Sequence, residues 1–531
     1  LPDAAPPASR AVTVAAPSSP SVLRRAAAVG VALHLAITGA LVIATRARTG
    51  GAMSYPLDDA FIHLALAKNL IHHGMFGVTR FAFTSTSSSV LWPFLLAPLE
   101  PIFGVYAPVV LATLASSVVP LLAAVAATEE NLPRKWVYSA SIAAVLLAPT
   151  PGLAALGMEH ALHVPASLAY LLALRRRLEG RPSPGFFLVA SAFLVAGTRY
   201  EGGILVALGT CALILVERKQ WRIAALSALA GLAPIVMFGL WAKAHGALFL
   251  PYSVVMKGAH PPPGFSATVG YFLAGAWEKL VATPALAVLA MVACCMLFVV
   301  KDRPRRAQLA VAIGTAALHV CVAAVGWFFR YEAYLIVILT AVLLAAGTDS
   351  LCRFKRLQVL GLVGMLFLAP AFRSAHMLAQ TPRAATNIFE QQVQIGRFAA
   401  REFPEAPVAV NDIGAVAYLH DAPIVDLMGL ASGSVAKARG YRIASALSPA
   451  VVAAETGGVP VAILYDRWFS GQLPSHWKAR RRWRISGVIT PAFATVTIYA
   501  CDPSTIDAVD AALARFEPLL PVGVERLPPE L

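Results

Sequence analysis

Two adjacent carboxylates, Asp58 and Asp59, lie between the first strongly apolar segment of the chain and the next one. A carboxylate at a bilayer surface is partly removed from water, which raises its pKa and lets it act as a general base at neutral pH. Apolar residues recur at helical spacing over residues 57–73, which predicts a short helix. Asp59 and His63 share one face of this helix, while Asp58 points elsewhere. An Asp before such a run is also a common N-cap, which would account for one of the two carboxylates.

The same loop offers ligands for a metal ion. Asp59 and His63 are the candidate ligands if a divalent cation such as Mg²⁺ or Mn²⁺ bridges the acids, although a lone surface histidine is the simpler interpretation. No other cofactor is indicated. The six cysteines form no CxxC or CxxH pair, which argues against a disulfide framework or a structural zinc site.

The composition predicts the class of protein in which these residues lie. Of the 531 residues, 58% are hydrophobic and 13% are charged, against roughly 25% charged in soluble proteins, so we expect a polytopic membrane protein. The net charge of +15 could indicate nucleic-acid binding, but the basic residues form short clusters between apolar runs. That pattern is typical of the positive-inside rule, and it predicts membrane lipids rather than nucleic acid as partners.

Five basic clusters are expected on the cytoplasmic side, with two spans between each consecutive pair. They lie at residues 134–135, 175–181, 218–222, 301–306 and 353–356. About eleven transmembrane helices follow, near residues 24–46, 107–127, 136–150, 160–175, 184–198, 202–217, 221–243, 282–300, 307–327, 331–348 and 355–372. Ser88–Gly104 is short and proline-rich, and we interpret it as an interfacial helix on the outer face.

The domain organisation follows from the same pattern. Residues 1–22 are rich in Ala, Pro and Ser and predict a disordered tail, and residues 23–375 form the transmembrane domain, with a first external loop at 49–106. Residues 376–531 combine short strand-like runs with helical stretches, which predicts a soluble α/β domain. An odd number of spans places this domain outside the cytoplasm. The expected location is therefore the plasma (inner) membrane, with the C-terminal domain extracytoplasmic.

The external loop and turns contain a series of short motifs. In the first loop they are Asp58–His63, Lys68–Leu70, His73-Gly74, Phe83–Ser85 and Val90–Trp92. Further motifs follow in order at Gly157–His160, Thr198–Gly202, Leu250–Ser253 with Lys257, Arg330-Tyr331, Asn411–Tyr418 and Ile424–Leu430.

These motifs resemble those of GT-C superfamily membrane glycosyltransferases, and most closely the branch of the mycobacterial arabinofuranosyltransferases. In that branch a DDAYI-type motif precedes a Tyr-Thr-Ser/Asn-Pro-Leu-Trp-like segment. The sequence departs from the pattern at Ser88-Ser89, where a polar residue and Pro are expected, and at Phe81-Ala82, where an acid and Gly are expected.

The resemblance implies a GT-C fold and an inverting transfer of a sugar from a polyprenyl-phosphate donor to an extracytoplasmic glycan, lipid or protein acceptor of the cell envelope. It also implies an acid in the first external loop as general base, for which Asp58 is the first choice and Asp59 the second. Direct attack by an activated hydroxyl needs one base, and the lipid phosphate leaves more readily when cations stabilise it. Arabinofuranose is the sugar of the branch.

Three basic residues are candidates for the donor phosphate. Arg199 and Arg330 can hold a phosphate bidentately, and Lys257 is a weaker third candidate. Pairing of the two arginines with Glu201 and Glu332 is the competing interpretation.

Further residues are candidates for substrate binding. They are His63, Glu159, Glu201, Tyr331 and Trp92. The two glutamates could equally cap helices or pair with a nearby base, and Trp92 could be an ordinary interfacial tryptophan. Asp412 and Asp426 at strand ends favour turn chemistry over an acceptor surface.

Two other functions remain as alternatives. A transporter or lipid flippase would have a similar number of spans, but it would place ionisable residues near the bilayer midplane, where this sequence has almost none. A membrane-anchored binding module would leave the Asp-Asp loop unexplained.

Overall fold

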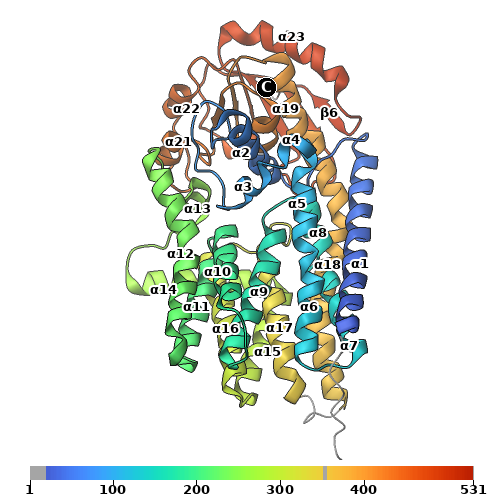
Figure 1. Ribbon diagram of the computed structural model, residues 1–531. Helices are drawn as coiled ribbons and strands as arrows, with labels where there is room; N and C mark the ends of the chain where they lie inside the picture. The colour runs from blue at the N-terminus through green and yellow to red at the C-terminus, as the bar shows by residue number, and fades with distance from the viewer. Residues whose placement is uncertain (1–19, 351–355, 530–531) are drawn as a thin grey trace, which may run out of the picture.

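The computed structural model describes residues 20–350 and 356–529. Most of the expected N-terminal tail, residues 1–19, and most of the fifth basic cluster, residues 353–355, lie outside the described residues. Helices form the lower part of the molecule, and a smaller sheet-containing part lies above them (Figure 1). The mostly helical architecture and the small C-terminal sheet domain are confirmed.

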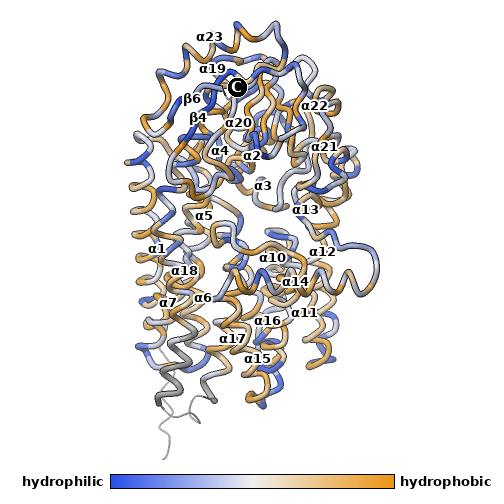
Figure 2. The backbone as a smooth tube through the Cα atoms, turned by 180° about the vertical axis from the view of Figure 1, so that it is seen from behind, coloured by the Kyte–Doolittle hydropathy of each residue, from blue (hydrophilic) through white to orange (hydrophobic). Residues whose placement is uncertain are grey.

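The helices of the lower part follow the apolar segments of the sequence. They are α1 (Pro20–Arg48), α5 (Ala107–Ser116), α6 (Val118–Glu129), α7 (Arg134–Leu147), α8 (Thr150–Leu156), α9 (His160–Leu178), α10 (Gly185–Thr198), α11 (Gly202–Val216), α12 (Trp221–Ala244), α14 (Phe265–Ala282), α15 (Pro284–Val299), α16 (Arg303–Val322), α17 (Ala333–Ser350) and α18 (Arg356–Ile388). Hydrophobic residues dominate the tube along most of these helices (Figure 2). Each of the eleven expected spans coincides with one of these helices or, at residues 107–127, with the successive pair α5 and α6.

Length and composition alone qualify fewer segments as spans. Four helical segments of the described chain are long and apolar enough to cross a membrane, and a fifth qualifies if the bent pair α14 and α15 is one span. The four are Pro20–Arg48, Glu100–Glu129, Arg134–Leu156 and Arg218–Ala244. The chain bends by 110° between α14 and α15. These segments support an integral membrane protein, and the count of eleven stays a prediction.

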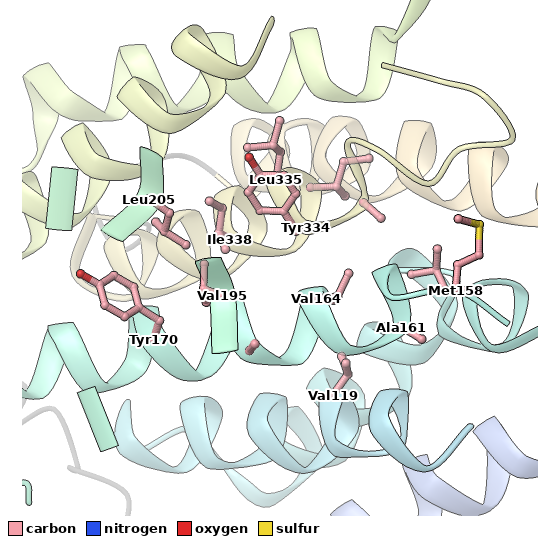
Figure 3. Close-up of a cluster of buried hydrophobic side chains, with 14 of the residues drawn as sticks. Val119, Met158, Ala161, Val164, Tyr170, Val195, Leu205, Tyr334, Leu335 and Ile338 are labelled. Carbon is pink, nitrogen blue, oxygen red and sulfur yellow. The ribbon is translucent and has the colours of Figure 1, made fainter. Parts of the chain in front are cut away.

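The helices pack around α9, which contacts α10, α17, α5, α11 and α6. Buried side chains from these helices fill the space beside α9 (Figure 3). Val164 and Tyr170 belong to α9 itself, Val195 to α10, Leu205 to α11 and Tyr334 to α17. Burial of such side chains is worth about 1.5–3 kcal/mol each against water, although between helices in lipid the gain comes from close packing instead.

The segment between α1 and α5, residues 49–106, folds as a set of short helices. The predicted helix after the two aspartates is α2 (Asp59–His73), and Gly74 ends it in a left-handed conformation at φ 66°. The single interfacial helix expected over Ser88–Gly104 is wrong, because the segment contains α3 (Trp92–Leu96), α4 (Glu100–Phe103) and the turn η1 (Gly104–Tyr106). Pro98 and Pro101 explain the break, since proline lacks the N–H of a helix interior.

Smaller helical elements complete the chain. They are η2 (Arg218–Gln220), α13 (Tyr252–Lys257), the π-helical turn η4 (Phe389–Val393), α19 (Gln394–Glu402), α20 (Gly414–Leu419), α21 (Gly433–Ala438), α22 (Pro449–Glu455), η5 (Asp466–Trp468), η6 (Pro503–Thr505), α23 (Ile506–Phe516) and η7 (Glu517–Leu519).

The C-terminal domain contains a six-stranded mixed sheet of order β2-β1-β3-β5-β4-β6. The strands are β1 (Val408–Val410), β2 (Ile424–Asp426), β3 (Val461–Leu464), β4 (Lys478–Ile485), β5 (Thr495–Ala500) and β6 (Val524–Leu527). The strand β1 runs parallel to β2 and β3, and the remaining pairs are antiparallel. The sequence predicts four of these strands, from β-like runs at residues 407–411, 424–427, 459–465 and 495–499, and they are confirmed as β1, β2, β3 and β5.

Residues 478–484 form a cationic run in the sequence, which predicts either contact with anionic lipid or polymer or a solvated face. In the structure the run lies in β4. Its arginines instead pair with acids of the domain: Arg480 with Asp510, Arg481 with Glu517 and Arg484 with Glu525. The run is therefore largely neutralised within the domain.

Candidate active site

A cavity of about 320 Å³ lies where the segment between α1 and α5, the ends of long helices and the C-terminal domain meet. Its lining comes from α2, residues 86–88, the turn at residues 199–201, α13, the end of α16, Arg330-Tyr331 and Leu430. Of the ten expected site residues, seven line it: Asp59, His63, Arg199, Glu201, Lys257, Arg330 and Tyr331. Segments more than 250 residues apart in the sequence thus contribute to one site.

Asp59 forms an ion pair across this cavity. Arg330 Nη2 donates a hydrogen bond to Asp59 Oδ2 at 2.6 Å, and Lys257 faces the same carboxylate. Burial alone would raise the pKa of Asp59, but the Lys257 ammonium and the Arg330 guanidinium outweigh burial and hold the pKa well below its usual range. Asp59 is therefore ionised at neutral pH.

Both arginines of the site lie against the ring of Tyr331. The Cζ atom of Arg330 lies 4.7 Å from the ring centroid of Tyr331, and that of Arg199 lies 5.1 Å from it. Arg330 Nη2 also donates to the Tyr331 hydroxyl at 2.9 Å. The ring attracts both cations, which offsets part of their mutual repulsion.

Arg199 is held by two carboxylates. Its Nη2 donates to Glu201 Oε1 at 2.5 Å, its Nε donates to Glu201 Oε2 at 3.1 Å, and its Nη1 donates to Glu159 Oε1 at 2.8 Å. Burial opposes ionisation of Glu201, but Arg199 lowers its pKa to about 2. Neither glutamate makes a side-chain cap at its own helix, so the pairing interpretation holds for both.

His63 joins α2 to this group of charges. Its Nε2 lies 3.2 Å from Glu159 Oε2, and its Nδ1 lies 3.2 Å from Ser87 Oγ. The imidazole is 2% exposed. His63 is therefore a buried link between α2 and the turn that begins α9, rather than a free surface histidine.

Asp58 faces away from Asp59 and binds the C-terminal domain. Its Oδ2 accepts from the backbone N–H of Gly414 at 2.7 Å, and its Oδ1 accepts from that of Ala415 at 2.8 Å. It makes no side-chain cap on α2, which excludes the N-cap interpretation. Asp58 therefore joins the start of α2 to the start of α20.

The environment of Asp58 has the opposite effect on its pKa from that of Asp59. Burial and the neighbouring Asp412 carboxyl raise the pKa of Asp58 to about 8, against the opposing hydrogen bonds from Ala415 and Gly414. Burial also raises the pKa of Asp412, whose Oδ2 accepts from Gln392 Nε2 at 2.9 Å. Asp58 thus lies beside a second carboxyl group, that of Asp412, whereas Asp59 faces the cations of the cavity.

Further contacts fix α20 against α2. Lys68 donates to Asp421 Oδ1 at 2.7 Å and to the backbone carbonyl of Tyr418 at 3.0 Å, and the ring of Tyr418 lies 6.2 Å from that of Phe61. The two helices lie together just above the ends of the long helices (Figures 1 and 2). The C-terminal domain is therefore part of the structure that positions Asp59.

Two expected residues, besides Asp58, do not line the cavity. Glu159 lies behind it and acts through Arg199 and His63. Trp92 is fully buried and donates from Nε1 to the backbone carbonyl of Gly157 at 3.3 Å, so it supports the turn that carries Glu159. Asp426 accepts from the backbone N–H groups of Met428, Gly429 and Ala431, as the turn interpretation predicts.

Sequence reasoning missed several contributors to the cavity, among them three hydroxyl residues and a leucine. Thr86, Ser87 and Ser88 line it beside Asp59, and Ser88 Oγ lies 3.2 Å from both Glu159 Oε1 and Arg199 Nη1. Leu430 closes the cavity from the C-terminal domain. The run of hydroxyl residues at 84–89 was the available signal, whereas an isolated leucine gave none.

The described residues contain no group of three or more His, Cys, Asp or Glu side chains arranged to hold a metal ion. The two candidate ligands have other partners: Asp59 pairs with Arg330, and His63 bridges Ser87 and Glu159. Two cations beside Asp59 also oppose the binding of a third. The residues present do not fit the divalent cation.

Comparison with known proteins gives limited matches. A family described as "Domain of unknown function (DUF8728)" matches residues 386–499, which is under half of the chain. No curated protein matches. The crystal structure of ArnT from Cupriavidus metallidurans bound to undecaprenyl phosphate is similar with a TM-score of 0.47 and 13% identity, covering 90% of this chain and 98% of that one. The apo structure of the same protein gives a TM-score of 0.46, with the same identity and coverage. Likenesses of this size do not assign the chain to a family.

Proposed function

We propose that this protein is an inverting glycosyltransferase that moves a sugar from a polyprenyl-phosphate donor to an acceptor hydroxyl, with Asp59 as general base. One observation supports the proposal above all. An ionised carboxylate, Asp59, and two cations that can bind a phosphate, Arg330 and Lys257, line the same cavity beside a set of apolar helices. One side of such a cavity can accept a proton while the other holds a phosphate.

The phosphate subsite is built from Lys257 and Arg330. Lys257 is exposed to the cavity and has no ion pair with a carboxylate in the described part of the chain. Arg330 is 2% exposed, and one of its terminal nitrogens already contacts Asp59. Arg199 is engaged by Glu159 and Glu201, so its task is to orient the site rather than to hold the phosphate.

Donor binding makes Asp59 a stronger base. The phosphodiester takes over the charge of Lys257 and Arg330, which until then lower the pKa of Asp59. The pKa of the carboxyl then rises toward the operating pH, where a general base is most effective. The base is thus activated by the donor it serves.

The transfer then takes place as a single displacement at the anomeric carbon. The acceptor hydroxyl gives its proton to Asp59 while its oxygen attacks the anomeric carbon of the donor. The bond from that carbon to the phosphate oxygen breaks, and its electron pair stays on the phosphate, where Lys257 and Arg330 stabilise the charge. The new bond forms opposite the leaving group, so the configuration inverts.

Asp58 is the positioning residue of this arrangement. Both of its oxygens accept backbone N–H groups of α20, and Asp58 does not line the cavity. This reverses the order of preference between the two aspartates that the family resemblance implies. Asp58 holds the start of α2, and with it the direction of the Asp59 side chain.

The membrane arrangement belongs to the same proposal. Eleven spans with the basic clusters in the cytoplasm place the cavity and the C-terminal domain on the extracytoplasmic side of the plasma membrane. The acceptor is then a glycan, lipid or protein of the cell envelope. Arabinofuranose stays the sugar expected from the motifs.

A transfer assay tests the proposal. Purified protein is incubated with a panel of polyprenyl-phosphate sugars and envelope acceptors, and transfer is compared between the wild type, Asp59→Asn, Asp58→Asn and Asp507→Asn. Asp507 is exposed in the first turn of α23 and serves as the matched acid-to-amide control. We expect one donor to be consumed, with a rate about 100-fold lower or more in Asp59→Asn, and an unchanged rate in Asp507→Asn.

Two results would contradict the proposal. A wild-type transfer rate in Asp59→Asn would show that Asp59 is not the general base. Movement of a polyprenyl-phosphate lipid across liposomes, without consumption of any donor in the panel, would favour the transporter.

A further inference from the structure

The loop that presents Arg330 and Tyr331 has an unusual backbone. Gly326, Trp327, Phe328 and Phe329 have φ values of 74°, 40°, 61° and 62°. They form a left-handed turn in which three of the four residues are not glycine. An L-residue is strained in this region because its Cβ approaches the following carbonyl oxygen. Successive aromatic residues keep this conformation only if their surroundings hold it there.

Two charged residues outside the cavity lining hold this turn. Glu332 Oε2 accepts from the backbone N–H of Gly326 at 2.8 Å, which closes the turn at its first residue. Arg373, on α18, donates to the backbone carbonyl of Phe329, the last residue of the turn. Arg373 also donates to Glu332 Oε1 from Nε at 3.1 Å and from Nη2 at 2.8 Å. Together Glu332 and Arg373 bind both ends of the turn.

The position of the pair suits a positioning role. Glu332 is 1% exposed and Arg373 is 7% exposed, so water does not weaken the bond between them. Glu332 follows Arg330 by two residues, and the Cζ atom of Arg373 lies 5.4 Å from the ring centroid of Phe329. The turn therefore cannot relax without moving Arg330, the guanidinium that contacts Asp59.

We infer that Glu332 and Arg373 are positioning residues of the donor-phosphate subsite, which hold the left-handed turn Gly326–Phe329 so that Arg330 and Tyr331 face the cavity. The inference rests on the proposed function. Loss of the pair releases the turn toward ordinary negative φ values, and the subsite must then be ordered by the ligand at the expense of affinity.

Binding of a polyprenyl monophosphate to the purified protein tests the inference without any transfer. The variants are Glu332→Gln and Arg373→Met. The matched control is Glu130→Gln, which disrupts another buried arginine–glutamate pair, with Arg175. Arg175 lies fifteen residues after His160 on α9, which is about 22 Å from the cavity end of that helix.

We expect the dissociation constant of the polyprenyl monophosphate to rise about tenfold in Glu332→Gln and Arg373→Met. It should be unchanged in Glu130→Gln even if the melting temperature of that control falls. In a transfer assay the donor KM should rise more than kcat falls. The conservative variant Arg373→Lys should recover part of the affinity, because a lysine can keep the charge of the pair but not its fork of donors.

A glycine substitution separates the strained turn from a general loss of packing. Trp327 is 55% exposed, so Trp327→Gly removes little buried surface while it relieves one left-handed residue. In the Arg373→Met background this change should restore part of the affinity. A pair that only stabilises the fold would lower the melting temperature and leave the affinity unchanged, and that result would overturn the inference. Absence of any binding by the wild-type protein would overturn the proposed function and the inference with it, whereas binding by the wild type and equally by both variants would overturn the inference alone.

Discussion

Arg330 Nη2 contacts Asp59 Oδ2 at 2.6 Å, so the base and the phosphate-binding cation of the proposed reaction are partners before any substrate binds. Each keeps the other ionised inside a largely buried site. A donor phosphate competes with Asp59 for Arg330, and this competition links donor binding to the strength of the base.

Asp59→Asn should separate catalysis from donor binding. The amide cannot accept the proton, so kcat should fall about 10²–10⁴-fold. Arg330 and Lys257 lose their carboxylate partner, so a polyprenyl monophosphate should bind at least as tightly as to the wild type. Parallel measurement of kcat and of the dissociation constant checks both effects. Weaker binding together with lost activity would indicate that Asp59 holds the site together instead of acting as its base.

Lys257→Met should change the pH profile. In the wild type Lys257 and Arg330 hold the pKa of Asp59 well below its usual range, so the base stays ionised into the acid range. Without the ammonium the pKa of Asp59 rises, and the acid limb of kcat/KM should move to higher pH. The donor KM should also rise, by about tenfold. The melting temperature at neutral pH should fall slightly, because Lys257 helps to stabilise the ionised Asp59 in the folded protein. If the acid limb of kcat/KM stays at the same pH in Lys257→Met, Lys257 does not lower the pKa of Asp59.

Docking of the C-terminal domain should weaken as the pH rises. The Asp58 carboxyl has a pKa of about 8 in the folded protein, where it faces Asp412, Asp59 and Tyr465, and about 3.9 in an unfolded chain. The folded state binds this proton more tightly, so stability is highest below the lower value and is lost as the pH rises toward about 8. Limited proteolysis of the C-terminal domain at about pH 6 and about pH 8.5 measures this change. Asp58→Asn should reduce the difference between the two pH values, whereas Asp507→Asn, at an exposed position of α23, should keep it.

Local sequence pattern predicted the elements that are defined locally. The apolar segments, α2 and four strands follow from hydropathy and from spacing along the chain. The strand β4 was not recognised because four arginines occupy a stretch of eight residues, and their acid partners lie 30 or more residues further along the chain. A charged strand is indistinguishable from a solvated run until its partners are known.

The division of work between the two aspartates could not come from sequence either. The helical spacing correctly indicated that Asp58 and Asp59 point in different directions. The partner of Asp58, the N–H of Gly414, lies 356 residues along the chain and is a backbone group that no motif identifies. The same holds for Arg373, which contacts Glu332 from the next helix. Contacts between distant segments decided which of the recognised residues reach the cavity.

Gly414→Ala should test the link between Asp58 and the C-terminal domain from the other side. A Cβ atom at Gly414 would lie 2.1 Å from the backbone oxygen and 2.7 Å from Oδ2 of Asp58. The backbone oxygen cannot move away without a shift of the start of α2, so transfer activity should fall and proteolysis of the C-terminal domain should accelerate. Gly457→Ala is the matched control, because a Cβ there meets only the carbonyl of Ala454 at 3.7 Å. Equal activity and equal proteolysis in the two variants would show that Asp59 is positioned without the C-terminal domain.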